Sequence, residues 1–168
     1  KKNVKKNITI GFDPWLHSIK EVETQKEALK NSIKLKPVNN LIDKVWLGRP
    51  HEGLSDPFLR PSILSGKNTN QKIKQIQNKL KLNRGQGLIL TCSESICWLA
   101  NIRGQDVPHS PLMNCYALVY QNHVFIYSMK DSYRDNVIKL RKNVTLKHFN
   151  VLFKDIKKLK KVFFEPTS

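Results

Sequence analysis

The chain has 168 residues, of which 39% are hydrophobic and 8% aromatic, and its formal net charge is +17. This length suits one domain, and no apolar run reaches the roughly 18–20 residues that a membrane span requires. The basic start, KKNVKKNITI, has no apolar stretch behind it, so we expect no signal peptide. Because the sequence also lacks an initiating Met, we expect a piece of a longer protein.

The positive charge is spread along the whole chain. Lys outnumbers Arg by 24 to 6, and only residues 1–6 and 154–161 form basic clusters. Proteins that bind nucleic acid usually add Arg forks and stacking aromatic side chains to such a charge. The composition therefore disfavours nucleic-acid binding. A free-standing basic module for nucleic acid or acidic partners is kept as an alternative, and its affinity would fall steeply with salt.

The first part of the chain predicts a β-α-β arrangement and a short helix. Residues 7–15 begin as a strand and end in an Asp-Pro turn. Ser18 and Glu21 form the S-x-x-E pattern of a capping box at the start of a helix. Alternating apolar and basic residues at 33–38 predict a strand, and residues 40–46 predict a short helix. The apolar face of the long helix contains Ile19, Val22 and Leu29.

A connecting segment at 48–68 is rich in Pro, Gly and polar residues and predicts irregular structure. Its length is unusual inside a compact domain and indicates a boundary or a functional wrap. After it, residues 69–83 predict a helix, 87–91 a buried strand, and 94–101 a short helix.

Two apolar segments, 113–120 and 123–129, predict the strands of a β-hairpin. Residues 132–143 predict a helix in which Ser132 and Asp135 form a second capping pair. The remaining predicted elements are a strand at 144–149, a helix at 150–161 and a strand at 162–166.

The alternation of these elements predicts an α/β fold with a mixed β-sheet flanked by helices. We expect a single domain made of a β-α-β part at 1–47, the link at 48–68, and a main α/β part at 69–168.

No catalytic or metal-binding set stands out in the sequence. Ser110 beside His109 lies in a Pro-bounded turn and has no G-x-S-x-G context. The five His residues are scattered without ligand spacing. Cys92, Cys97 and Cys115 show no C-x-x-C pattern, and we expect them to be reduced and buried. We therefore predict no catalytic residue, no metal ligand and no cofactor in this chain.

The stretch ICWLANIRGQDVPHSP, at 96–111, is the most site-like part of the sequence. Its two prolines stiffen an extended loop, and Gly104 permits a backbone geometry that other residues resist. A stiff loop with Arg103, Asp106 and His109 is suited to gripping a peptide terminus or a carboxylate. The alternative is that Arg103 and Asp106 pair with each other and only hold the loop.

Three ordered blocks of the sequence resemble the Xaa-Pro aminopeptidase (aminopeptidase P) family in its long, three-domain form. They are GFDPWLHSIKEVETQKEALK, LKPVNNLIDKVWLGRP, and ICWLANIRGQDVPHSP followed by YALV. The family pattern is G-x-D-P-x-L, then P-V-x-x-N-L-(I/V)-D-x-(I/V)-W-x-x-R-P, then I-A-W-L-x-N-(L/I)-R-G-x-D-V. Cys97 departs from it, since the family tends to have Ala there.

The resemblance implies a creatinase/prolidase N-terminal domain-like fold and a metallopeptidase context. The family is a hydrolase that removes the N-terminal residue of peptides whose second residue is proline. It uses two metal ions, commonly manganese, held in a C-terminal pita-bread domain, which we expect after Ser168. On this basis we expect a cytoplasmic protein whose chemistry lies outside this chain, so that the chain alone is inactive.

The resemblance also implies an accessory role in shaping and restricting the peptide cleft. The expected partners are the catalytic domain of the same protein, proline-containing peptides in the full enzyme, and a second copy in a homodimer, with no membrane. A remnant of a decayed peptidase gene is a further alternative. The substrate-cleft or domain-interface candidates are Asn101, Arg103, Gly104, Asp106 and His109.

Overall fold

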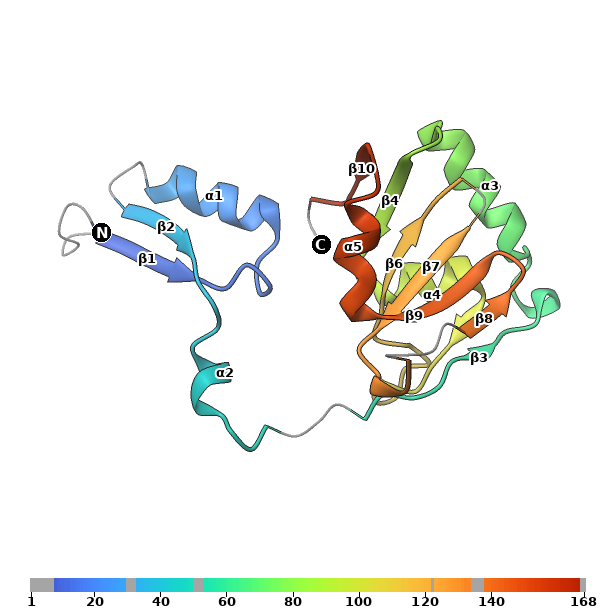
Figure 1. The fold of residues 1–168 in the computed structure, drawn as a ribbon, viewed down its shortest axis with the longest axis horizontal. Coiled ribbons are helices and arrows are strands. Elements are labelled where there is room, and N and C mark those ends of the chain that lie inside the picture. Colours follow the sequence, from blue (N-terminus) through green and yellow to red (C-terminus); the bar gives the residue numbers. More distant parts are fainter. Residues whose placement is uncertain (1–7, 30–32, 50–52, 122, 134–137, 167–168) are drawn as a thin grey trace. The chain divides into compact units, whose positions relative to one another are not determined.

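The computed structural model describes residues 8–29, 33–49, 53–121, 123–133 and 138–166 (Figure 1). The chain divides into two compact units. Unit 1 comprises residues 1–51 and 166–168, and unit 2 comprises residues 52–165, which include most of the predicted link.

Unit 1 contains, in sequence order, a strand, a helix, a second strand and a short helix, as predicted. Its two strands are parallel, with Ile8 opposite Ile33. The capping box is confirmed: Ser18 N donates to Glu21 Oε2 (2.8 Å), and Glu21 N donates to Ser18 Oγ (3.2 Å). The elements are β1 (Ile8–Phe12), α1 (Ile19–Leu29), β2 (Ile33–Pro37) and α2 (Ile42–Val45).

Unit 2 contains a six-stranded mixed sheet in the order β10-β4-β6-β7-β9-β8 (Figure 1). The pairs β10–β4 and β7–β9 are parallel, and the other neighbours are antiparallel. The predicted hairpin is confirmed as β6 and β7, and the mixed sheet with flanking helices is confirmed as the fold class. The strands of the sheet are β4 (Gln86–Leu90), β6 (Tyr116–Val119), β7 (Val124–Ser128), β8 (Ile138–Arg141), β9 (Val144–His148) and β10 (Lys161–Phe163).

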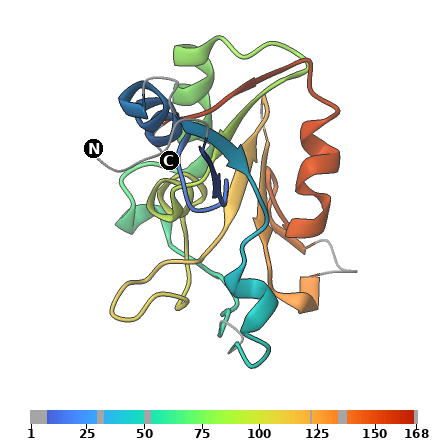
Figure 2. The same ribbon diagram turned by 90° about the vertical axis from the view of Figure 1, so that its left-hand side faces the viewer.

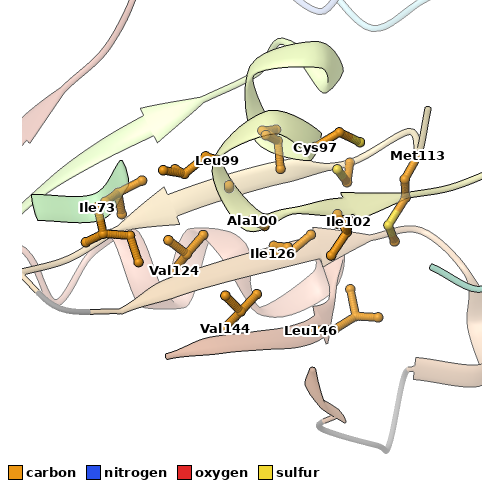
Figure 3. Close-up of a cluster of buried hydrophobic side chains, with 14 of the residues drawn as sticks. Ile73, Cys97, Leu99, Ala100, Ile102, Met113, Val124, Ile126, Val144 and Leu146 are labelled. Carbon is orange, nitrogen blue, oxygen red and sulfur yellow. The ribbon is translucent and has the colours of Figure 1, made fainter. Parts of the chain in front are cut away.

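The helices of unit 2 cover both faces of this sheet. They are α3 (Thr69–Leu80), α4 (Ser93–Ala100) and α5 (Leu152–Ile156), with short 3-10 turns at η1 (Ser62–Leu64), η2 (Asp131–Tyr133) and η3 (Phe149–Val151). The larger core lies under α3 and α4 (Figure 3). Ile73 of α3 and Leu99 of α4 pack there against Val124, Ile126 and Leu146 of the sheet.

The second core cluster lies under α5. Leu152 packs there with Leu118 and Tyr127, which are buried side chains of the sheet. The alternation of side chains along a strand explains the two clusters, because Ala117 of β6 belongs to the first cluster and its neighbour Leu118 to the second.

The predicted helix at 132–143 is wrong. Residues 138–141 form β8, which pairs antiparallel with β9. Ile138 and Leu140 alternate with Lys139 and Arg141, a period of two that suits an edge strand. Pairing with β9 supplies the backbone partners that a helix would have provided internally. Ser132 belongs to η2, while Asp135 of the predicted capping pair lies outside the described residues.

The cysteines are free, and the prediction that all three are buried is wrong for Cys92. Cys97 and Cys115 are buried, whereas Cys92 is exposed. Cys92 precedes α4 as its N-cap residue, and its Sγ donates to Glu94 Oε2 (3.0 Å). Burial raises the pKa of the Cys97 and Cys115 thiols.

We expect the native chain to show one fast thiol, from Cys92, when it is treated with a thiol-specific reagent at pH 8. Cys97 and Cys115 should react only as fast as the protein opens, because each is buried and its reactive thiolate form is disfavoured. Timed alkylation followed by mass spectrometry checks this. Cys92→Ser should abolish the fast phase, and a remaining fast phase in that variant would contradict the assignment.

Candidate functional site

The predicted loop begins where α4 ends. Asn101 adopts a left-handed backbone conformation (φ 51°, ψ 47°) and closes the helix. Asn tolerates this conformation better than most residues, which explains its place at a helix end. The Asn101 side chain is buried, and its Nδ2 donates to the Lys67 carbonyl oxygen (3.0 Å).

Side chains from α3 hold the C-terminus of α4. Lys72 is 1% exposed, and its Nζ donates to the Trp98 carbonyl oxygen (2.6 Å) and to Asn101 Oδ1 (2.5 Å). Thr69 Oγ1 donates to the Ala100 carbonyl oxygen (3.1 Å). The last carbonyls of a helix lack partners within the helix and attract cations, so these contacts fix the origin of the loop. Burial lowers the pKa of Lys72, and the charge of Arg103 lowers it further.

Arg103 also contacts α4. Its Nη1 donates to the carbonyl oxygens of Cys97 (3.2 Å) and Ile102 (2.7 Å), and the side chain is half-buried. The guanidinium group therefore helps to close the helix end.

Gly104 is buried where the loop passes the segment that returns to β6. A Cβ atom at this position would lie 2.8 Å from Met113 Cβ and 2.9 Å from the Leu112 carbonyl oxygen. Real Cβ atoms do not approach other atoms so closely, and one of these neighbours belongs to the backbone. Gly104 is thus required by close approach of two chain segments.

The Asp106 carboxylate joins three segments. Its Oδ1 accepts hydrogen bonds from Ser55 N and Ser55 Oγ, both at 2.6 Å, and its Oδ2 accepts one from Asn114 N (2.7 Å). Ser55 Oγ in turn accepts from Gln105 N (2.7 Å). Since Asp106 bonds to Ser55 and Asn114, and Arg103 to carbonyl oxygens, the alternative in which Arg103 and Asp106 pair is wrong.

The link before α3 runs alongside this loop. Its strand β3 (Phe58–Leu59) pairs antiparallel with β5 (Ile102–Arg103), and Arg60 N donates to the Asn101 carbonyl oxygen (2.8 Å). The segment at 53–60 thus forms a strap along the candidate loop.

The strap is also tied to the segment that follows β7. Asp56 Oδ1 accepts hydrogen bonds from Lys130 Nζ (2.7 Å) and from Tyr133 Oη (2.5 Å). These bonds lower the pKa of Asp56, while burial raises that of Tyr133. These hydrogen bonds hold the strap, and with it the loop, against the rest of unit 2.

The tip of the loop is the part that faces solvent. Val107 and Ser110 form an isolated antiparallel bridge, and Ser110 N donates to the Val107 carbonyl oxygen (3.1 Å). Within this tight turn His109 has a positive φ of 59° and is exposed. Figure 2 shows the segment after β5, in yellow, extending beyond the ends of the strands.

A cleft of about 310 Å³ lies beside the Asp106 network, at one end of the sheet. It is bordered by the strap, by the start of α4, and by the ends of β4, β6 and β7. Its lining residues include Leu54, Ser93, Asn114, Cys115, Tyr116 and Met129. We call this space the edge cleft.

The structure separates the five predicted residues by role. Asn101 and Gly104 are buried and shape the loop, Arg103 and Asp106 are half-buried and hold it, and His109 is exposed at the tip. Sequence reasoning missed Lys72 and Ser55, which are the main partners of Asn101 and Asp106. Helical spacing could have found Lys72, because it lies beside Ile73 on the apolar face of α3.

The donors in the described part of the chain do not fit a metal centre. Within the described ranges, no three His, Cys, Asp or Glu side chains are grouped so that they could hold a metal ion. In the same part of the chain, no helix is both long enough and apolar enough to cross a bilayer.

Comparison with known proteins identifies the family. The sequence profile of the Creatinase/Prolidase N-terminal domain matches residues 48–168. Aminopeptidase P1 of Lotus japonicus is 30% identical over 149 residues, which cover 83% of this chain and 23% of that protein. The probable Xaa-Pro aminopeptidase P of Chaetomium globosum is 32% identical over 158 residues, covering 90% of this chain and 25% of that protein. The chain belongs to the creatinase/prolidase N-terminal domain family, as the resemblance predicted.

A solved structure has the same fold. X-prolyl aminopeptidase from Caenorhabditis elegans, described as a cytosolic enzyme with a di-nuclear active site, superposes with a TM-score of 0.76 at 23% identity. The alignment covers 92% of this chain and 26% of that chain. The present chain therefore spans about a quarter of the length of the relatives that it matches.

Proposed function

We propose that this chain is a non-catalytic, accessory part of a metal-dependent Xaa-Pro aminopeptidase, and that it shapes and restricts the peptide cleft of that enzyme. The single observation that supports this most is the family match over residues 48–168, together with relatives named as aminopeptidases P. The whole-protein activity proposed is hydrolysis of the bond that precedes proline at a peptide N-terminus.

The partner in this proposal is a catalytic domain of the same protein. The chain matches only about a quarter of each relative, which leaves room in those proteins for the catalytic part. The two metal ions, for which we propose manganese, belong to that part, since the donors described here form no metal site. The cytosol is the proposed location, by analogy with the Caenorhabditis elegans enzyme.

The loop at 101–111 and the edge cleft are the proposed surface toward the catalytic domain or the bound peptide. The contacts of Asp106 with Ser55 and Asn114 hold this surface in a fixed shape. A preformed surface loses little entropy on contact with a partner, which suits a wall of a cleft. His109 supplies an exposed polar side chain at the tip, and Arg103 lies at the end of α4.

The size of the native product and its activity test the proposed function. An immunoblot of source cells with an antibody to this chain should show a band several times larger than 19.5 kDa. The larger product should cleave an Xaa-Pro peptide in the presence of manganese and leave the matching Xaa-Ala peptide intact, whereas the 168-residue chain alone should cleave neither. Cleavage by the chain alone, or a native band at 19.5 kDa, would refute the proposal.

His109→Ala in the larger enzyme should raise KM for an Xaa-Pro peptide about fivefold, which corresponds to a contact worth about 1 kcal/mol. Its melting temperature should stay unchanged, because His109 is exposed at a loop tip. Arg103→Ala should raise KM as well but also lower the melting temperature, since Arg103 closes α4. Lys157→Ala on the exposed surface of unit 2 is the control. An unchanged KM in both loop variants would show that the loop is not part of the surface that faces the peptide.

A further inference from the structure

Two lysine-rich turns of unit 2 have no part in the proposed function. The first turn follows α3, and the second follows α5. The sequence shows the basic cluster at 154–161, but only the fold brings residues 79–84 beside it. We call the two turns together the basic surface. Its cations are Lys79, Lys81, Arg84, Lys157, Lys158, Lys160 and Lys161, and all of these residues are exposed.

Strand pairing places the two turns side by side. The first turn leads into β4 and the second into β10, and these strands are parallel neighbours with Lys161 opposite Gln86. Parallel neighbours begin at the same end of a sheet. The backbone joins the turns directly, since Lys160 N donates to the Gly85 carbonyl oxygen (2.7 Å). In Figures 1 and 2 the two turns meet at the upper end of unit 2.

Few carboxylates balance the charge of the basic surface. Residues 78–86 and 156–164 contain no Asp or Glu. In the part of the chain that the structure describes, Lys158 is the one cation of this surface that forms an ion pair with a carboxylate, that of the buried Asp155 (2.7 Å). Cations gathered in this way produce a positive local potential. The basic surface therefore attracts an anionic partner.

An exposed aromatic ring borders these cations. Phe153 is 50% exposed and lies one helical turn before Lys157 on the outer face of α5, next to Lys154. Lysines around an exposed phenyl ring are typical of elements that lie in the headgroup region of a bilayer. A surface for RNA would combine Arg forks with several stacking rings, whereas Arg84 is the single Arg of the basic surface.

We infer that the basic surface binds peripherally to an anionic phospholipid bilayer, with its lysine ammonium groups on the anionic headgroups and Phe153 at the headgroup level. Each cation close to such a surface raises the affinity about fivefold. The inference replaces the expectation from the sequence that the chain has no membrane partner. It goes beyond the proposed function and does not depend on it.

The position of the basic surface is compatible with the proposed function. Arg84 and Gly85 precede β4, whereas Thr91 and Ser93, which line the edge cleft, follow it. The two sites thus lie at opposite ends of this strand. A bilayer on the basic surface would contact the end of unit 2 that is remote from the edge cleft.

Co-sedimentation with lipid vesicles tests the inference, both with the 168-residue chain and with the longer native protein. Each should bind vesicles of phosphatidylcholine that contain about 30% phosphatidylserine, and should bind pure phosphatidylcholine vesicles at least about tenfold more weakly. Salt at about 0.5 M should release the protein, because it screens the charges. Equal binding to both kinds of vesicle, or no binding by the longer protein, would overturn the inference.

A triple variant in the longer protein locates the binding surface. The combination of Lys79→Glu, Lys81→Glu and Lys157→Glu should lower the affinity for the anionic vesicles by at least about a hundredfold, since it reverses three charges in the two turns. The melting temperature should stay unchanged, because all three residues are exposed. Undiminished binding by this folded variant would overturn the inference.

A second triple variant controls for the net charge of the chain. The combination of Lys34→Glu, Lys67→Glu and Lys139→Glu removes the same charge from exposed positions outside the basic surface. It should lower the affinity less than about tenfold, because surface potentials fall off within a Debye length. If both triple variants lost affinity equally, the binding would follow from net charge alone, and the inference would be wrong.

A competing polyanion distinguishes a bilayer from nucleic acid. A single-stranded RNA of about 20 nucleotides should bind more weakly than the anionic vesicles, because the basic surface has one aromatic neighbour and one Arg. Tighter binding to the RNA, lost in the variant of the two turns, would assign the surface to nucleic acid and overturn the inference. Phe153→Ala should weaken vesicle binding about fivefold, and an unchanged affinity would contradict the placement of its ring among the headgroups.

Discussion

Asp155→Ala is expected to lower the free energy of unfolding of the chain by about 3 kcal/mol. Asp155 of α5 is buried, and its Oδ2 accepts hydrogen bonds from Lys147 Nζ (2.8 Å) and Tyr127 Oη (2.9 Å). Without the carboxylate, the Tyr127 hydroxyl and the largely buried Lys147 ammonium lose their partner. Urea denaturation followed by circular dichroism measures the difference.

Lys158→Ala is the graded control for this prediction. Lys158 Nζ also contacts Asp155 (2.7 Å), but its side chain is 61% exposed. An exposed ion pair contributes about 0–1 kcal/mol, so this variant should change stability little. If both variants lost the same free energy of unfolding, burial of the ion pair would not be what determines its contribution to stability.

The same carboxylate should make stability depend on pH. Burial acts to raise the pKa of Asp155, but hydrogen bonds from Lys147, Lys158 and Tyr127 outweigh burial and hold the pKa below its ordinary value of 3.8. The ionised form is thus favoured by folding, so its contribution is present above that value and is lost as pH falls through the lower, folded-state pKa. The stability difference between wild type and Asp155→Asn should be constant from pH 7 to about pH 5 and shrink below about pH 4. A difference that grows on acidification would contradict this sign.

Gly104→Ala is expected to lower the free energy of unfolding by about 1–3 kcal/mol. The new Cβ would meet Met113 Cβ at 2.8 Å, and the Leu112 carbonyl oxygen and Met113 Cα at 2.9 Å. Two of these atoms belong to the backbone and the third is bonded directly to it, so the loop must shift to relieve the overlap. Loss of the hydrogen bond between Asp106 and Asn114 should follow. Denaturation would measure the loss of stability, and a peptidase assay of the longer enzyme would measure the effect of the shifted loop on activity.

Gly53→Ala is the matched control, because a Cβ at that position meets no atom within 4 Å. An Ala there should be neutral or slightly stabilising, since it restricts the unfolded chain. If both variants lost the same stability, close packing against Met113 would not be the reason for glycine at position 104.

Local patterns in the sequence predicted most of the elements. The capping box of Ser18 and Glu21, the hairpin of β6 and β7, and the helix α4 each depend on residues close together in the chain. The helix predicted at 132–143 was wrong because residues 138–141 pair as β8 with the next strand, β9, an interaction that the prediction of a single helix left out. Whether a segment forms a strand depends on the strand with which it pairs, and the propensity of the segment alone does not show that pairing.

By itself, the sequence determined the family, the α/β class and the loop at 101–111 as the site-like segment, because motifs and side-chain periodicity are local properties. Only the tertiary structure decided what each loop residue does. Asp106 meets Ser55 across 51 positions, and Lys72 meets Asn101 across 29. Hydrogen bonds over such separations depend on how the sheet and helices bring the segments together, so no local pattern encodes them.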